Sequence, residues 1–273
     1  MSDPIEDFRM AIAAAGLEAP DNINPDGAIH RFSSNGKPTN KNGWYILHLD
    51  GIAAGSFGDW REGFTQNWCS KAYTSMTEAE RFAQRDRVKA MQRQGEKDLV
   101  QRQQLAAADA HKRWTDATPC TQHDYLTRKG VQPHGAKIEG DMLLIPMRDT
   151  SGMVHSMQTI APDGIKLFMS GGRVKGCYFG IGKPKGVLIV CEGFATGASI
   201  HECTGHAVAV AFNAGNLEAV AVALRTKYPT LKIIIAADDD HLTPGNPGIA
   251  KAKAAVIATG AALAIPVFKA ATT

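Results

Sequence analysis

The sequence predicts an α/β protein whose parallel sheet is preceded by a β-rich subdomain, a helical spacer and a small N-terminal α+β module. Three observations lead to this prediction. From residue 187 onward, short apolar runs alternate with amphipathic segments of helix length, which is typical of a parallel sheet covered on both faces. Residues 121–186 contain strand-like runs separated by glycines. Residues 77–120 form a long polar stretch without proline before Pro119, which favours helix.

The N-terminal module covers residues 1–76. It opens with a helix-like stretch that is ended by Gly16 and Pro20, and short β-like runs rich in glycine and aromatic residues follow. The turn signals at 35–36 and 42–43 are both Asn-Gly, a pair that favours tight hairpins. We therefore expect a small and mostly antiparallel sheet here.

The spacer is predicted to form one or two long polar helices. Thr77 is a plausible N-cap with acidic residues in the turn after it, and Gly95 is the weakest point of the helical pattern. A charged helix surface of this kind is usually only solvated. We therefore assign no chemistry to residues 77–120.

The remaining elements are predicted from local patterns. A short helix, "HDYLTRKGV", is turned by Gly130, and the runs "DMLLIPMRD", "GMVHSMQTIAP", "GIKLFM" and "GCYFGIG" read as strands of the subdomain that ends at 186. The sheet that follows, within 187–273, is expected to use four apolar strands, at 187–192, 207–212, 232–237 and 262–268. The helices between them are predicted in "ATGASIHECTG", "NLEAVAVALRTKY" and "PGIAKAKAAVIATG".

Carboxylates follow two of these four strands. Glu192 ends the first, and three consecutive acids, 238–240, end the third. Because alternate side chains of an extended chain share a face, Asp238 and Asp240 can point together, towards Glu192 on a neighbouring strand. Converging carboxylates raise one another's pKa or bind a hard cation such as Mg²⁺ or Mn²⁺. A solvated loop or a set of helix N-caps is the alternative.

The order of these motifs resembles a Toprim domain, in which a Glu-Gly pair follows one apolar strand and Asp-x-Asp follows another. The segment before it is similar to the corresponding part of DnaG-type primases of plasmids, phages and other mobile elements. The similar motifs there are "IPMRD" at 145–149, Lys166-Leu167-Phe168 and "GGRVKGCYFG". The first zone, "RFSSNGKPTNKNGWYILHLDGIAAGSFGDWREG", resembles the N-terminal module of plasmid and phage primases.

This resemblance implies roles for particular residues. Glu192, Asp238 and Asp240 would be the catalytic residues and also the metal ligands, with Glu192 a candidate general base. Lys166, Arg173 and Lys175 would face template or nucleotide phosphates, and Arg128, Lys129 and Arg148 are weaker candidates for the same role. Ordinary surface charge remains the alternative for each of them. Trp44 and Trp60 are candidates to stack bases, and a place in the hydrophobic core is their alternative.

The implied function is a DNA primase that makes short RNA primers on single-stranded DNA from ribonucleoside triphosphates, with Mg²⁺ or Mn²⁺. A replicative helicase is a possible partner. Two other functions stay open: a Toprim nuclease that cleaves nucleic acid, and a non-catalytic module that binds single-stranded DNA.

The chain departs from the family pattern in two places. His30, His48 and Cys69 do not supply four ligands at zinc spacing, so we expect an N-terminal module without a zinc site. A further acidic motif is expected beyond the last strand, where the sequence reads "AIPVFKAATT". Either the chain is a fragment of a longer replication protein or it works with fewer metal ligands.

Composition sets the remaining expectations. A net charge of +3 does not indicate nucleic-acid binding by itself, so such a signal must be local. The sequence has no apolar run of membrane-spanning length and no signal-peptide pattern, so we expect a cytoplasmic protein that does not bind membranes. Its five cysteines are scattered singly, which favours reduced thiols.

Overall fold

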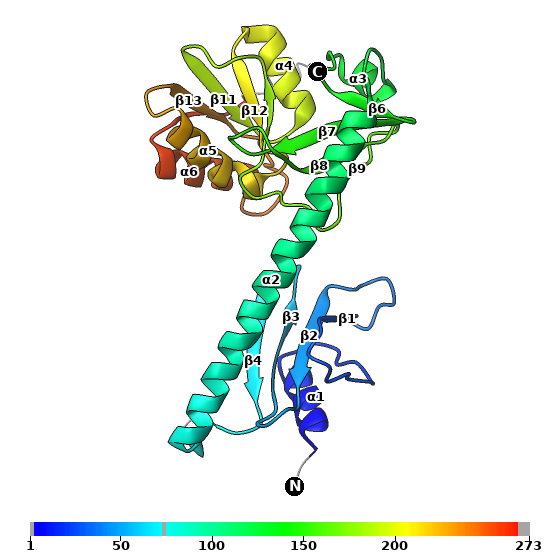
Figure 1. Cartoon of the computed structure of the whole chain (residues 1–273), viewed down its shortest axis with the longest axis vertical. Helices are drawn as coiled ribbons and strands as arrows, with labels where there is room; N and C mark the ends of the chain where they lie inside the picture. Colours follow the sequence, from blue (N-terminus) through cyan, green and yellow to red (C-terminus); the bar gives the residue numbers. More distant parts are fainter. Residues whose placement is uncertain (1–2, 73–74, 267–273) are drawn as a thin grey trace. The chain divides into compact units, whose positions relative to one another are not determined.

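The computed structural model describes residues 3–72 and 75–266. It divides into two compact units, Met1–Gln94 and Gly95–Thr273 (Figure 1). This division is coarser than the four segments that the sequence predicts, so their boundaries stay predictions.

The first unit is a four-stranded antiparallel sheet with helix α1 (Pro4–Ala14) packed on one face. Phe8 and Ile12 of this helix are fully buried against Tyr45, Leu47 and Phe57 of the sheet. Burial alternates strictly along β2, as expected for a strand with one face in a core. The predicted helix and antiparallel sheet are therefore confirmed. The strands, in sheet order, are β1 (His30–Phe32), β2 (Gly43–His48), β3 (Ala54–Asp59) and β4 (Phe64–Cys69).

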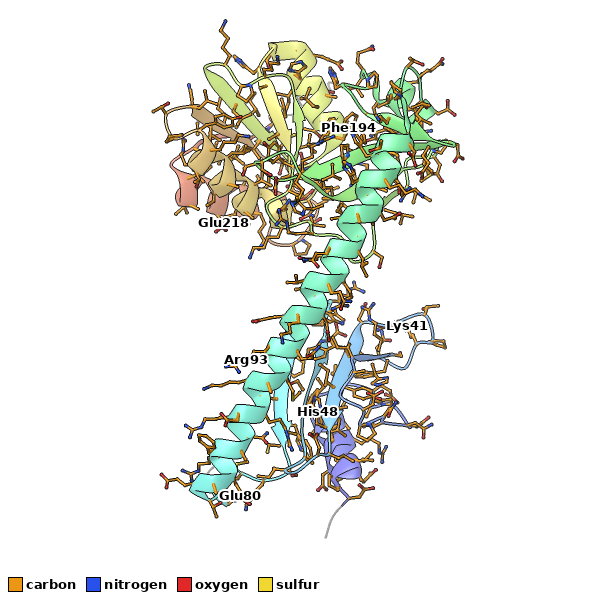
Figure 2. The ribbon with its side chains drawn as sticks, viewed as in Figure 1. Lys41, His48, Glu80, Arg93, Phe194 and Glu218 are labelled. Carbon is orange, nitrogen blue, oxygen red and sulfur yellow. The ribbon has the colours of Figure 1, made fainter. Side chains whose placement is uncertain are left out.

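Helix α2 (Glu78–Asp116) is one continuous helix, and residues of both units belong to it. Its start is a capping box: the Glu80 amide donates to Thr77 Oγ1 at 3.3 Å, and the Thr77 amide donates to Glu80 Oε2 at 2.8 Å. Most of its side chains are exposed, and Figure 2 labels Arg93 among them. In the second unit, Ala106 and Ala110 are the buried residues of this helix.

The second unit begins with a five-stranded antiparallel sheet beside helix α3 (Asp124–Lys129). As predicted, this short helix ends at Gly130, which has a positive φ of 63°. The strands β5 and β6 are additional to the predicted ones, because two or three residues carry too little pattern to be recognised. The sheet order is β5 (Thr118–Pro119), β6 (Lys137–Glu139), β7 (Met142–Arg148), β8 (Val154–Ile160) and β9 (Lys166–Phe168).

The other sheet of this unit contains the four predicted parallel strands and one more. The sequence places the run 176–182 in the preceding subdomain, but Phe179–Ile181 pairs antiparallel with a strand of this sheet and forms its edge. Within the predicted strand 262–268, a strand covers Ala262–Ala264, and residues 267–268 lie outside the described residues. The order is β10 (Phe179–Ile181), β12 (Ala207–Val210), β11 (Val187–Cys191), β13 (Lys232–Ala236) and β14 (Ala262–Ala264).

Helices cover both faces of this parallel sheet, as predicted (Figure 1). Successive residues of β11 belong to different cores: Ile189 packs with helix α4 (Phe194–Thr204), whereas Val190 packs with α5 (Leu217–Lys227) and α6 (Pro247–Thr259). The core on the α4 side also contains apolar residues of β7. The β-rich subdomain and the parallel sheet therefore share one hydrophobic core.

A search of the described residues finds no helix with the length and apolar character needed to cross a membrane.

Candidate active site

The acidic residues lie at one edge of the parallel sheet. Strands β11 and β13 are direct neighbours, with Val190 opposite Ile235. Glu192 and Asp238 follow these strands, so their backbones leave the sheet side by side. A hollow of about 600 Å³ opens beside the acids. It is lined by Thr196, Ile200, Ala236, Ala237, Asp238, Asp239, Asp240, Ala264, Ile265 and Pro266.

The carboxylates repel one another, as their pKa values show. Burial, together with the negative charges of Asp238 and Asp240, raises the pKa of Glu192 to about 7, although a hydrogen bond from the Ala214 backbone acts in the opposite direction. Burial and Asp240 likewise raise the pKa of Asp238, and Lys166 opposes this rise. One oxygen of Glu192, Oε1, is buried and has no hydrogen-bond partner within the described part of the chain.

The other two acids of the loop are engaged with the start of α6. Asp240 Oδ2 accepts a hydrogen bond from the Gly248 amide at 3.1 Å, and Asp239 Oδ1 accepts one from Asn246 Nδ2 at 2.7 Å. Gly248 permits this close approach, since a Cβ there would lie 2.3 Å from the Asp238 carbonyl oxygen. Asp240 therefore also anchors a helix N-terminus, in keeping with part of the alternative interpretation.

The donor set fits a hard divalent cation. It consists of carboxylate oxygens alone, one of them buried without a partner, and their mutual repulsion is what a cation relieves. Among the residues that the structure describes, however, no three His, Cys, Asp or Glu side chains are already gathered closely enough to hold a metal ion. The ligand roles of Glu192, Asp238 and Asp240 stay predictions.

Of the predicted basic residues, Lys166 is the one that the structure relates to the acids. Lys166 is exposed on β9, lies 5.5 Å from the centre of the Tyr125 ring, and is close enough to Asp238 to lower its pKa. Arg173 and Lys175 lie in the loop between β9 and β10, where Lys175 is exposed. Arg128 and Lys129, in the last turn of α3, are exposed as well.

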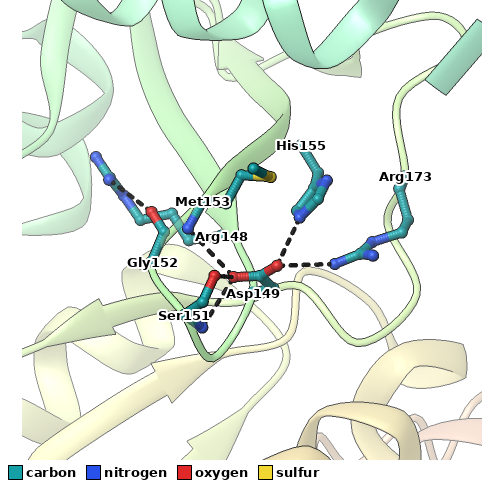
Figure 3. A network of polar contacts seen from close by, with 7 residues as sticks. All are labelled: Arg148, Asp149, Ser151, Gly152, Met153, His155 and Arg173. Atoms are coloured by element: carbon teal, nitrogen blue, oxygen red, sulfur yellow. Dashed lines mark hydrogen bonds and ion pairs between the residues drawn. The ribbon is translucent and has the colours of Figure 1, made fainter. Parts of the chain in front are cut away.

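Arg148 differs from the other basic candidates. Its guanidinium carbon lies 5.2 Å from the centre of the Trp114 ring, and Nη1 donates to the Gly152 carbonyl at 3.3 Å. Burial lowers the pKa of Arg148. In Figure 3 its side chain extends away from Asp149, on the opposite side from Arg173. Arg148 therefore contacts α2, and the structure does not bring it to the acids.

Asp149 organises a polar network that the sequence did not indicate (Figure 3). Its carboxylate accepts hydrogen bonds from Ser151 Oγ at 2.5 Å and from His155 Nε2 at 2.7 Å, and Arg173 Nη2 lies 3.4 Å away. Burial would raise the pKa of Asp149, but the hydrogen bonds from Ser151 and His155 hold it well below its usual range. Asp149 stands in the "IPMRD" motif, but nothing in its spacing connects it with Arg173.

The two tryptophans lie on the first unit's sheet and its adjoining turn. Trp44 and Trp60 are 5.4 Å apart between ring centres, and Trp60 is 55% exposed. Trp44 lies opposite Gly58 on β3, and a Cβ at Gly58 would come within 3.0 Å of the indole nitrogen. Trp60 is thus not a core residue, whereas Trp44 is half-buried. Base stacking by either stays a prediction.

Comparison with known proteins gives consistent results. Residues 187–271 match the family model for the Toprim domain. Two proteins from Escherichia coli, both called DNA primase TraC, are 35% and 33% identical over 97% of this chain. The alignments cover 20% and 26% of those proteins, so the chain spans about a quarter or less of the curated relatives it matches.

Two solved structures are weakly similar. The DnaG primase catalytic domain bound to single-stranded DNA has a TM-score of 0.43 and 11% identity, covering 62% of this chain and 72% of that one. The primase fragment of the bacteriophage T7 primase-helicase has a TM-score of 0.40 and 15% identity, covering 57% and 68%. At these values the likeness carries no argument of its own.

Proposed function

Because this chain carries a Toprim domain and is a relative of the plasmid-type Toprim primases, we propose that it is the primer-synthesising part of a DNA primase. Its template would be single-stranded DNA, and its substrates would be ribonucleoside triphosphates. A replicative helicase is a partner that this function favours, and the cytoplasm is its expected location.

One observation carries the proposal: Lys166, on β9, lies near the acids that follow β13, a strand of the other sheet. Lys166 lowers the pKa of Asp238 although the two residues belong to different sheets. Phosphoryl chemistry needs this combination, because cations bound by the acids and basic side chains together neutralise the charge of the reacting phosphates. A purely structural acidic loop has no need of Lys166.

The residues have distinct tasks in this reaction. The 3′-oxygen of the primer attacks the α-phosphorus of the incoming nucleotide, and the bond from that phosphorus to pyrophosphate breaks. Glu192 would accept the 3′-hydroxyl proton, since its Oε1 has no hydrogen-bond partner among the described residues. Glu192, Asp238 and Asp240 would hold Mg²⁺ or Mn²⁺, which supplies charge neutralisation at the phosphates.

Each unit offers residues that would bind the template. Lys166, Arg173 and Lys175 would contact phosphates, and Arg128 and Lys129 would add exposed positive charge on α3. In the first unit, exposed Trp60 beside Trp44 offers a stacking surface that does not depend on base identity.

Primer synthesis on single-stranded DNA with labelled ribonucleotides tests this proposal. The parent chain should give short labelled products in Mg²⁺ or Mn²⁺ and none in EDTA. Asp238→Asn should abolish them, while the matched change at the neighbouring position, Asp239→Asn, should leave most activity, because an asparagine there can still accept the hydrogen bond from Asn246.

The other outcomes identify the alternatives. Cleavage of the template without nucleotides, sensitive to Asp238→Asn, would establish a nuclease. DNA binding without synthesis, and indifferent to the same substitution and to metal, would establish a binding module. Either result would overturn the primase proposal.

A further inference from the structure

A short turn after β12 contacts both halves of the candidate active site. It covers residues 213–216, at the start of α5. The backbone of Ala214 lies close enough to the Glu192 carboxylate to lower its pKa. Two residues later, the side chain of Asn216 is directed to a different segment, the loop between β9 and β10.

Both ends of the Asn216 side-chain amide form hydrogen bonds. Its Oδ1 accepts a hydrogen bond from the Gly176 amide at 2.8 Å, and its Nδ2 donates to the carbonyls of Cys177 and Ala211, both at 2.9 Å. The residue is 3% exposed. A buried polar side chain with two bonds to a distant loop and one to the residue after β12 orders that loop relative to the sheet, because breaking one bond leaves a buried group unsatisfied.

The loop that Asn216 holds carries the basic residues Arg173 and Lys175. Its other end is fixed by Gly172, which packs against buried Ser156 so closely that a Cβ would lie 2.2 Å from the hydroxyl oxygen. Arg173 itself is held by Asp149 (Figure 3). Between Arg173 and β10, Asn216 supplies the side-chain hydrogen bonds that tie the loop to the parallel sheet.

We propose that Asn216 is a positioning residue, which fixes the basic loop 171–177 relative to the turn that contacts Glu192. The proposal rests on the function proposed above and deepens it. The side-chain amide of Asn216 would hold the basic loop, which binds phosphates, at a fixed position relative to the acidic residues. Asn216 does not touch the reacting atoms. Its loss would act through Lys175 and Arg173, which would then sample many positions and bind phosphate less tightly.

Amide hydrogen exchange in loop 171–177 tests whether Asn216 holds this loop, without any assumption about function. In Asn216→Ala, exchange at Gly176 and its neighbours should be at least tenfold faster than in the parent chain. Asn213→Ala is the matched control in the same turn, because the Asn213 side chain makes no capping hydrogen bond. Unchanged exchange in a folded Asn216→Ala chain would overturn the proposal. If that variant does not fold, Asn216→Asp replaces it: a carboxylate cannot donate to the Cys177 and Ala211 carbonyls, so exchange in the loop should again be faster than in Asn213→Ala, and unchanged exchange would overturn the proposal.

A double-mutant cycle then tests whether Asn216 affects DNA binding through the basic loop. Affinity for a fluorescein-labelled oligothymidylate is measured for the parent, Lys175→Ala, Asn216→Ala and the double variant. Each single change should weaken binding several-fold, and the double variant should be no weaker than Asn216→Ala within about twofold, because the lysine is already ineffective. A double loss equal to the product of the single losses would show a merely structural role and overturn the proposal.

The two tests separate the inference from the function on which it rests. If the parent chain does not bind the oligonucleotide, the proposed function fails, and the exchange experiment alone decides whether Asn216 holds the loop. If the parent binds and synthesises but the cycle is additive, the function stands and the role of Asn216 falls.

Discussion

Replacing Glu192 by glutamine is expected to stabilise the metal-free protein. In the native chain this carboxyl is buried beside Asp238 and Asp240, and these surroundings raise its pKa from 4.5 to about 7. Glutamine has nearly the same shape but no charge, so it removes the cost of burying a carboxylate among others. A residue assigned to catalysis is thereby predicted to reduce the stability of its own fold.

The magnitude follows from the pKa shift. The rise from 4.5 to about 7 corresponds to about 3 kcal/mol at high pH, at about 1.4 kcal/mol per unit. Because the side chain is only half-buried and screened by solvent, we expect about half of this, roughly 1–2 kcal/mol. For a domain of this size the melting temperature should rise by about 3–6 °C.

The pH dependence has a definite sign. The native chain binds the Glu192 proton more tightly than the unfolded chain does, so the contribution of this residue to stability is most favourable below pH 4.5 and is lost as the pH rises to about 7. Glutamine does not titrate. The advantage of Glu192→Gln should therefore be small below pH 4.5 and reach its full size above pH 7.

Calorimetry in EDTA between pH 4 and pH 8 measures this difference. The matched control is Glu202→Gln: hydrogen bonds from the Gln132 amide and His134 lower the pKa of Glu202, so the same substitution there should lower the melting temperature. Added Mg²⁺ should stabilise the parent and narrow the gap to Glu192→Gln. A variant that melts lower than the parent at pH 8 in EDTA would refute the reasoning.

Three further predictions follow from individual contacts. Gly248→Ala would place a Cβ 2.3 Å from the Asp238 carbonyl oxygen, so α6 must shift, and primer synthesis should fall at least tenfold in a labelled-nucleotide assay. Asp149→Asn should lower the melting temperature at pH 7. Because hydrogen bonds hold the pKa of Asp149 well below its unfolded value, the parent loses this advantage as the pH falls below about 4, and the two melting curves should converge there. Thr77→Ala removes the cap of α2 and should cost about 1 kcal/mol in urea unfolding of the first unit.

Controls for these predictions are available in the chain. Gly95→Ala meets no atom within 4 Å and lies within a helix, so it should stabilise by about 0.5–1 kcal/mol, in contrast to Gly248→Ala. Thr115→Ala, near the other end of α2, tests the cap, because the Thr115 hydroxyl bonds back to His111 rather than capping a helix start. Parallel melting curves for Asp149→Asn and the parent from pH 3 to 7 would contradict the assigned pKa.

Local sequence patterns predicted most of the fold, because a buried strand or helix face requires apolar residues at regular positions. The parallel strands are short apolar runs, and the acids follow them directly, so the edge that carries Glu192 and Asp238 could be inferred without any coordinates. The cap at Thr77 and the turn at Gly130 are also local signals, and the structure contains both.

Pairing between distant segments was not predictable in the same way. The residue pattern of Phe179–Ile181 is compatible with a strand in either sheet of the second unit. Only its pairing with β12 shows to which sheet it belongs. The same applies to side chains: Asp149 meets Arg173, and Asn216 meets Gly176, across separations that leave no spacing signal. The neighbouring residue Arg148 was grouped with the phosphate-binding candidates, although its guanidinium lies against α2.

Cys191, the last residue of β11, gives the site a built-in chemical reporter. Its thiol is fully buried, and burial together with Asp238 and Glu192 raises its pKa, so alkylating reagents cannot attack it in the closed protein. Cys203, on α4, is exposed and should react at once. Cys120 and Cys177 are buried as well, so mass spectrometry must identify the label on Cys191 itself. Slow labelling at that residue would report openings of the strand end next to Glu192, and a bound cation should make those openings rarer.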